Sequence, residues 1–255
     1  MQPSPTTSVA DRPQRRTLIT VATYNELANL PSLTQAIWEA VPAADVLVID
    51  DNSPDGTGTW CDGRRQSEPR LHCLHRTGKL GLGTAIVEGM KYGIAHEYDF
   101  VLNMDADFSH HPRYLPALIA GMDPAQGPPI DVMIGSRYVA GGGTVNWPFR
   151  RKLMSRTVNL YARCMLGLKA NDCSGAFRCY RVSLLKKLDF SLVRSRGYSF
   201  QEEILWLLKR LGARFGETPI EFADREHGVS KIDSAEALAA LRVIFRLGVR
   251  NWIGV

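Results

Sequence analysis

Short, almost continuously apolar runs alternate with helix-like segments through the first half of this chain. Runs of this kind, rich in aliphatic and β-branched residues, occupy positions 17–24, 45–51, 71–75, 100–104 and 131–138. Strands that are apolar at nearly every position are typical of a parallel sheet that is buried on both faces. The pattern therefore predicts an α/β fold with a mostly parallel central sheet and helices on both faces.

The second half follows a looser version of the same pattern. Helices are expected at 27–41, 82–96, from Pro112 onward, 150–166 and 200–211, and further strands at 175–181 and 214–222. We expect one domain over 17–233, a mobile Pro/Ser/Thr-rich tail over 1–16 and a basic amphipathic helix over 234–255. The 255 residues can bury a core without disulfides, and the 5 cysteines form no CxxC pair, so free thiols are expected.

Polar residues follow several of the expected strands at the point where each strand ends. They are Thr23-Tyr24-Asn25-Glu26, Asp50-Asp51-Asn52 and Asp105-Ala106-Asp107. In open α/β sheets, ligands bind beyond the carboxyl ends of the strands. We therefore expect these clusters to meet at one edge of the sheet and to form the binding site.

Asp105 and Asp107 are the strongest candidates for metal ligands. Two carboxylates this close repel each other, and a divalent cation is a reason to keep both ionised. The alternative is a surface turn, but the position at a strand end favours the metal. The segment 50–56 is interpreted equally well as a nucleoside-binding loop or as a turn that only ends its strand.

Common nucleotide-binding and hydrolase fingerprints are missing. The Gly-rich segment 79–83 lacks the Lys-Ser/Thr of a Walker A loop, and no GxGxxG follows the first strand. No GxSxG elbow is present. His110 and His111 fit a helix cap and turn better than a zinc site, because no further His/Cys spacing supports zinc. The sequence thus lacks the usual ATPase, NAD(P) and serine-hydrolase signatures.

The net charge of +5 is divided unevenly along the chain. Residues 1–131 hold 10 Lys/Arg and 16 Asp/Glu, whereas residues 132–255 hold 21 and 10. The basic residues of the second half cluster in two places, with Arg137, Arg150, Arg151, Lys152 and Arg156 in one and Arg225 and Lys231 in the other. Arginine suits bidentate phosphate contacts, and a solvated basic face is the alternative. Nucleic acid is disfavoured, because the acidic first half would repel a duplex.

The C-terminal segment predicts a basic amphipathic helix. Arg242, Arg246 and Arg250 repeat every four residues, which places them on one stripe among apolar neighbours. The helix either packs its apolar face on the core or lies on an anionic membrane or a membrane-anchored partner. No uninterrupted apolar stretch reaches the roughly 18–20 residues that a spanning helix needs.

The motifs form an ordered set. They are Thr23-Tyr24-Asn25-Glu26, the segment 50–57, the segment 79–85, the segment 104–112, Gly135-Ser136-Arg137-Tyr138, Phe200-Gln201-Glu202-Glu203 and the segment 225–231. This set resembles the dolichyl-phosphate (polyprenyl-phosphate) mannosyltransferases, within the family-2 inverting glycosyltransferases. Ala22 stands where the best-known form of the first motif has proline, which removes no polar group.

The resemblance implies a GT-A (Rossmann-like) nucleotide-diphospho-sugar transferase fold and a peripheral enzyme on the cytosolic face of a membrane. It implies a GDP-mannose donor, a polyprenyl phosphate acceptor, a Mg²⁺ or Mn²⁺ ion and contact with an anionic membrane surface or a small membrane-anchoring subunit. The metal would be held by Asp105, Asp107 and Ser109, a position where some relatives have Gln.

The resemblance also assigns the remaining site residues by position. The nucleotide would be bound by Thr23, Tyr24, Glu26, Asp51, Lys79, Asp105 and Ala106. Donor and acceptor phosphates would be faced by Arg137, Arg151, Ser155, Arg225 and Lys231. Asp107, Arg137 and Arg151 would be the catalytic residues.

The chemistry of the residues agrees with this resemblance. An acceptor phosphate is already ionised at pH 7 and can attack an anomeric carbon without a general base. That explains a site with carboxylates for metal and arginines for anions but no obvious catalytic histidine. The alternatives are a polyprenyl-phosphate glucosyltransferase that uses UDP-glucose, and a nucleotide-sugar-binding subunit without transfer activity.

Overall fold

A seven-stranded sheet forms the centre of the protein in a computed structural model that describes residues 15–223 and 234–253. In sequence order its strands are β1 (Thr17–Thr23), β2 (Asp45–Asp50), β3 (Leu71–His75), β4 (Phe100–Asp105), β5 (Val132–Ser136), β7 (Arg178–Arg181) and β8 (Phe215–Pro219). Their spatial order is β3-β2-β1-β4-β7-β5-β8, and only β7 runs antiparallel to its neighbours. The prediction of a mostly parallel sheet is confirmed.

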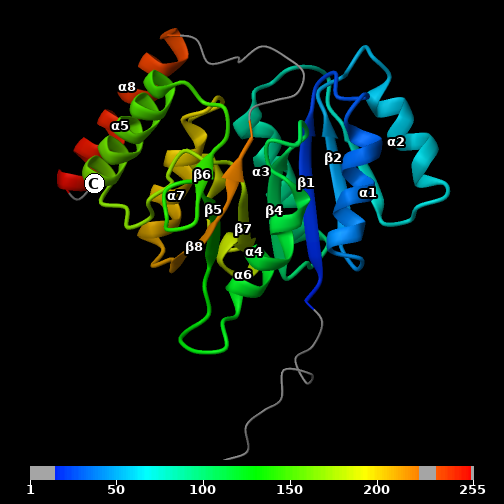
Figure 1. Cartoon of the computed structure of the whole chain (residues 1–255), viewed down its shortest axis with the longest axis horizontal. Helices are drawn as coiled ribbons and strands as arrows, with labels where there is room; N and C mark the ends of the chain where they lie inside the picture. Colours follow the sequence, from blue (N-terminus) through cyan, green and yellow to red (C-terminus); the bar gives the residue numbers. More distant parts are fainter. Residues whose placement is uncertain (1–14, 224–233, 254–255) are drawn as a thin grey trace, which may run out of the picture.

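Helices cover both faces of this sheet, as the apolar strands predict (Figure 1). One face packs against α1 (Leu30–Ala40), α2 (Thr57–Arg65) and α4 (Leu115–Met122). The other face packs against α3 (Leu82–Ala95), α5 (Phe149–Leu166), α6 (Val182–Leu185), α7 (Phe200–Arg210) and α8 (Ser234–Ile253). Short 3₁₀ turns at Pro112–Tyr114 and Phe190–Leu192 and a small ladder of β6 (Gly143–Thr144) with β9 (Glu221–Phe222) complete the described elements.

Successive strand residues feed two separate cores. On β2, Val46 and Val48 enter the core under α1 and α2, while Leu47 and Ile49 enter the core under α3. This alternation follows from the period of two along a strand. All of these side chains are at most 1% exposed, so the sheet is buried on both faces.

Several elements differ from the sequence expectation. The helix α2 was not expected, because its sequence TGTWCDGRR has little apolar periodicity. The strand expected at 214–222 is divided into β8 and β9 after Pro219, which has no backbone N–H to continue a ladder. The helix expected from Pro112 begins as a single 3₁₀ turn and becomes α4 at Leu115.

The helix α8 makes two kinds of surface. Ile244 and Leu247 are 0% and 1% exposed and belong to the core, so the expected core packing is present. Phe245 and Trp252 are 57% and 74% exposed on the outer side. Figure 1 shows α8 beside α5 at one end of the molecule, with α2 at the other end.

Candidate active site

The carboxyl ends of β1, β2 and β4 meet at one edge of the sheet, as the strand-end clusters predict. In the parallel ladders, Thr23 is paired with Asp50 and Ala22 with Asp105. The backbone N–H of Asp51 also donates to the carbonyl of Thr23 at 3.0 Å. The predicted nucleotide and metal residues of these strands therefore share one edge.

The loop after β2 is held by its own carboxylates. Asp50 is 2% exposed and accepts hydrogen bonds from the hydroxyls of Thr23 and Ser53. Asp55 accepts from the hydroxyl of Thr57 at 2.6 Å and from the backbone N–H of Leu27 at 3.0 Å. The turn interpretation thus holds for Asp50 and Asp55, which fix the loops around the site.

Asp51 is the carboxylate of this loop that faces a cation. Its Oδ1 is 2.6 Å from Nη1 of Arg76, and the other end of that guanidinium contacts the hydroxyl of Thr84. Burial raises the pKa of Asp51, and the charge of Arg76 partly offsets that rise. Arg76 was not expected from the sequence, and its place directly after β3 is the only signal that could have indicated it.

Tyr24 and Lys79 also come together. The Lys79 ammonium lies 3.5 Å from the centroid of the Tyr24 ring, which is a cation–π contact. A backbone hydrogen bond from Leu80 reaches the Asp51 carboxylate and ties the Gly-rich segment to the strand ends. Glu26 begins the turn into α1, where its carboxylate accepts from the Asn29 amide at 2.9 Å.

Asp105, Asp107 and Ser109 offer a set of oxygen donors at the end of β4. Asp107 is 9% exposed, and its Oδ1 accepts from the backbone N–H of Ser109 at 3.1 Å. Phe108 between them has a left-handed backbone with φ 59°, which turns the chain sharply. The Ser109 hydroxyl is buried and has no hydrogen-bond partner among the described residues. Ala106 is buried beside them at 4% exposure.

His110 holds this turn in place through its contacts with Asp105 and Phe177. It is buried and stacks on Phe177 with ring centroids 4.9 Å apart. The backbone N–H of Asp105 donates to its Nδ1 at 3.1 Å, and burial lowers the pKa of His110, so the ring is neutral with its proton on Nε2. His111 accepts from the backbone N–H of Arg113 and caps the following turn. The cap-and-turn interpretation of the two histidines is confirmed.

Arg137, at the end of β5, is held by a carboxylate that the sequence did not indicate. Its Nε and Nη2 donate to the two oxygens of Asp172, each at 2.7 Å, and Nη2 also donates to Ser174 at 2.9 Å. Burial alone would raise the pKa of Asp172, but the charge and hydrogen bonds of Arg137 reverse the effect and lower it. Two of the three guanidinium nitrogens are thus engaged within the protein. The polar loop around Asp172, NDCSG, is the sequence signal that could have found this partner.

Arg151 and Ser155 extend the site onto α5. The Arg151 guanidinium carbon lies 3.9 Å from the centroid of a Trp147 ring, and the Ser155 hydroxyl lies 2.6 Å from the Tyr138 hydroxyl. Arg225 and Lys231 lie outside the described residues.

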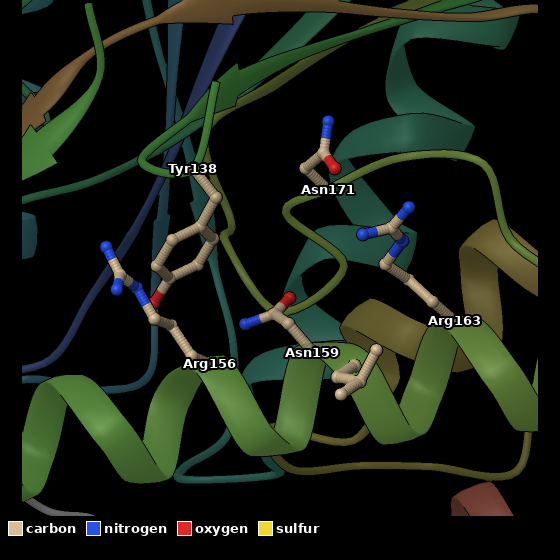
Figure 2. Close-up of a pocket in the computed structure, with 6 residues that line it drawn as sticks. Tyr138, Arg156, Asn159, Arg163 and Asn171 are labelled. Atoms are coloured by element: carbon tan, nitrogen blue, oxygen red, sulfur yellow. The ribbon is translucent and has the colours of Figure 1, made fainter. Parts of the chain in front are cut away.

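A basic cavity of about 310 Å³ opens beside these residues along α5 (Figure 2). It is lined by Tyr138, Arg156, Asn159, Leu160, Arg163 and Asn171. A second hollow of about 220 Å³ adjoins Arg137, Lys152 and Arg156. The wall on the α5 side is therefore cationic, in contrast to the carboxylates at the ends of β2 and β4.

The first turn of α7 contains three buried polar side chains, Gln201, Glu202 and Glu203. Glu203 accepts from the backbone N–H groups of Ser195 and Arg194 at 2.6 and 3.1 Å, so it fixes the preceding loop. Glu202 is 3% exposed, its Oε2 has no hydrogen-bond partner among the described residues, and burial raises its pKa to about 7. The side-chain amide of Gln201 is equally buried and unpartnered within that part of the chain.

Residues 18–189 match the sequence profile of the family described as "Glycosyl transferase family 2". The chain is 43% identical over 241 residues to an undecaprenyl-phosphate mannosyltransferase of Micrococcus luteus, covering 94% of this chain and 97% of the relative. It is 41% identical over the same length to a polyprenol monophosphomannose synthase of Mycolicibacterium smegmatis, covering 94% and 89%.

Solved structures share the fold at lower identity. The glucosyl-3-phosphoglycerate synthase of Mycobacterium tuberculosis with UDP matches with a TM-score of 0.63 at 20% identity, covering 91% of this chain and 81% of that one. The same enzyme with Mn²⁺, UDP and its product matches with a TM-score of 0.59 at 20% identity, covering 94% and 79%. The chain therefore is a glycosyltransferase with a GT-A fold and belongs to glycosyl transferase family 2, in the group that includes these polyprenyl-phosphate mannosyltransferases.

Proposed function

We propose that this enzyme transfers mannose from GDP-mannose to a polyprenyl phosphate, with inversion at the anomeric carbon. The observation that carries the proposal is that carboxylates and arginines face each other across the site. The chain is also 41–43% identical to the undecaprenyl-phosphate mannosyltransferase and the polyprenol monophosphomannose synthase named above. Carboxylates stand at the end of β4, and an arginine–aromatic wall stands at the end of β5 and the start of α5.

We assign the donor to the carboxylate side of the site, which is the part formed by the ends of β1, β2 and β4. Tyr24, Asp51 and Lys79 would receive the nucleoside, because they gather at the ends of β1 and β2. Asp105, Asp107 and the Ser109 hydroxyl fit a divalent cation, since all are hard oxygen donors and that buried hydroxyl lacks a partner among the described residues. A Mg²⁺ or Mn²⁺ ion bound there would stabilise the charge on the departing nucleoside diphosphate.

We assign the acceptor phosphate to the arginine side of the site, which is the part formed by the end of β5 and the start of α5. Arg151 is held against the Trp147 ring, and Ser155 and Tyr138 offer hydroxyls 2.6 Å apart. Arg137 is held by Asp172, so its charge and its remaining nitrogen are fixed in place before the substrate arrives. Arg225 and Lys231 stay proposed phosphate ligands.

The reaction needs little proton transfer. A phosphate oxygen of the acceptor attacks the anomeric carbon from the side opposite the leaving group, which gives inversion in a single displacement. Since that oxygen is ionised at neutral pH, the neutral and buried His110 has no proton to accept and acts as support for the turn. The contribution of the chain is positioning and charge stabilisation.

The acceptor is a lipid, so the enzyme has to meet a membrane surface. Among residues 15–223 and 234–253, no helix combines the length and apolarity that a membrane crossing requires. We propose peripheral contact through α5 and α8, directly or through an anchoring subunit. Phe149 on α5 and Trp252 on α8 are 77% and 74% exposed, and Arg242, Arg246 and Arg250 of α8 are exposed as well.

A second donor is considered because the same enzyme in the solved structures was also captured with UDP-glucose. Under that alternative the chain is a polyprenyl-phosphate glucosyltransferase. A binding subunit without transfer activity is disfavoured by the intact oxygen-donor set of Asp105 and Asp107.

A donor screen tests the proposal. The purified chain would be incubated with undecaprenyl or dolichyl phosphate in anionic vesicles, a divalent cation and either GDP-mannose or UDP-glucose. We expect lipid-linked mannose from GDP-mannose only. Lipid-linked glucose would support the alternative, and no turnover with any donor would contradict both.

A further inference from the structure

A cluster of metal-binding side chain types lies between α2 and the edge strand β3, at the end of the molecule opposite α5 and α8 (Figure 1). Cys61 and Asp62 are adjacent on α2. Cys73 and His75 lie two residues apart on β3 and therefore on one face of that strand. The proposed transfer reaction uses none of these side chains.

The geometry brings three different donor atoms together. One ligand atom from each of Asp62, Cys73 and His75 lies within 4.8 Å of the other two. Nε2 of His75 is 3.0 Å from Oδ1 of Asp62. Zinc bonds of about 2.0–2.3 Å place the ligands of a tetrahedral ion roughly 3–4 Å apart. Small side-chain shifts are therefore enough to close this group around one ion.

The surroundings leave one sulfur within reach of solvent. Cys61 is buried in the core, whereas Cys73 is only partly buried and packs against that core. Metal binding releases the proton of the thiol, because thiolate is the metal ligand. Asp62 and His75 have side chains 59% and 50% exposed, so an ion can enter from solvent.

We propose that Asp62, Cys73 and His75 form a Zn²⁺ site with a water molecule as the fourth ligand. A mixed sulfur, nitrogen and oxygen set selects a borderline metal over Mg²⁺, which requires oxygen ligands. The site is therefore distinct from the Asp105 and Asp107 pair. Zinc bound here cross-links α2 to the last residue of β3.

This cross-link lies close to the proposed donor side. His75 directly precedes Arg76, whose guanidinium contacts Asp51. A Cβ placed on Gly58 of α2 would lie 2.9–3.0 Å from both the His75 ring and the Asp50 carboxylate, so ring and carboxylate are near neighbours. Occupancy of the site stabilises the folded chain because the three ligands come together only on folding.

Cobalt titration of the full chain tests the proposal. After treatment with chelator and reductant, Co²⁺ would be added without oxygen while the visible and near-ultraviolet spectrum is recorded. We expect one equivalent to give a thiolate-to-cobalt charge-transfer band and the intense visible bands of a four-coordinate ion, both abolished by Zn²⁺ and unaffected by excess Mg²⁺. A spectrum of hexa-aqua type, without a thiolate band, would overturn the proposal.

Single variants assign the ligands. Cys73→Ala should abolish the charge-transfer band, and His75→Ala should weaken binding by at least about tenfold, since even outer-shell partners of metal sites cost that much. Cys164→Ala is the matched control, because Cys164 is an exposed thiol on α5, and it should bind like the wild type. The site would be contradicted if folded Cys73→Ala gave the wild-type spectrum. It would also be contradicted if His75→Ala, which changes a half-exposed side chain, bound Co²⁺ with unchanged affinity.

Discussion

Two arginine–aspartate pairs stand at opposite sides of the same sheet edge, and they are built differently. On the carboxylate side, Arg76 contacts one oxygen of Asp51, and the two side chains are 5% and 13% exposed. On the arginine side, Arg137 contacts both oxygens of Asp172, and the two side chains are 8% and 0% exposed. The Asp51 carboxylate therefore keeps some exposure to the site, whereas the Asp172 carboxylate is fully buried and holds Arg137 in place.

The difference separates ligand-facing groups from groups that hold the wall. A buried charge is tolerated only while its partner is present, and removal of one partner leaves the other uncompensated. The Arg76–Asp51 pair loses less, because it is joined by one side-chain hydrogen bond, whereas Arg137 and Asp172 are joined by two. Asp51 is therefore suited to contact a substrate, while Asp172 is suited to keep Arg137 and the neighbouring ring of Tyr138 in place.

The largest expected effect is a loss of stability on the arginine side. We expect Asp172→Ala to lower the free energy of unfolding by about 3–5 kcal/mol, because Arg137 is left buried without its partner. Asp51→Ala should lower it by a smaller amount, about 1.5–3 kcal/mol, because one charge-assisted hydrogen bond is lost and Arg76 keeps its contact with Thr84. Urea denaturation of both variants measures the difference, and equal losses would remove the distinction between the two pairs.

The next effect is on activity and concerns the carboxylate side. We expect Asp107→Ala to reduce kcat by a factor of roughly 10²–10³, because charge stabilisation at the leaving group is lost. Its stability should stay near that of the wild type, and its binding to anionic vesicles should not change. Transfer at the wild-type rate would show that the donor phosphates are bound elsewhere.

The sequence predicts site residues that are adjacent along the chain, but it does not predict pairs of residues that are distant in sequence and meet only in the fold. Asp105 and Asp107 could be placed because a buried strand and its polar end are adjacent in sequence. Asp172 and Arg76 could not, because their partners Arg137 and Asp51 are 35 and 25 positions away and meet them only through the sheet order. The same limit applied to α2, whose buried face is too short to show a helical period.

The assignment of individual carboxylates also needed the structure. Asp50, Asp51 and Asp55 are indistinguishable as residue types in one turn-rich segment. Asp50 and Asp55 accept hydrogen bonds from hydroxyls and backbone N–H groups in or next to the loops after β1 and β2, whereas Asp51 contacts the Arg76 guanidinium. The strand-end pattern therefore predicted the place of the binding site, while the role of each carboxylate depends on tertiary contacts.

Glu202 under the arginine side predicts a dependence of stability on pH. Its pKa is about 7 in the folded protein and has an ordinary value of 4.5 when exposed, so the folded state holds its proton more tightly. Stability from this group is complete below pH 4.5 and is lost as the pH rises through 7, a loss of roughly 3 kcal/mol. Glu202→Gln cannot lose a proton.

We therefore expect the variant to gain stability relative to the wild type by about 2.5 kcal/mol between pH 5 and pH 8. Urea denaturation at both pH values measures this change, and Glu39→Gln on the exposed side of α1 serves as the control. If the difference between Glu202→Gln and the wild type is the same at both pH values, the buried carboxyl does not carry the proton at neutral pH.

The smallest expected effect tests whether the two sides bind different substrates. Arg151 lies against Trp147 on the arginine side, so we expect Arg151→Ala to raise the KM for polyprenyl phosphate about tenfold, or roughly 1.4 kcal/mol, the size of one charge-assisted contact. The KM for GDP-mannose should change little. Arg150→Ala removes the same charge from an exposed neighbouring position of α5 and is the matched control for a general loss of positive potential. A rise in the GDP-mannose KM with Arg151→Ala alone would place Arg151 with the donor. Equal effects of both variants on the acceptor would mean that α5 attracts the lipid phosphate only by its overall charge, and the division of the sheet edge into a donor side and an acceptor side would then rest on Asp107 alone.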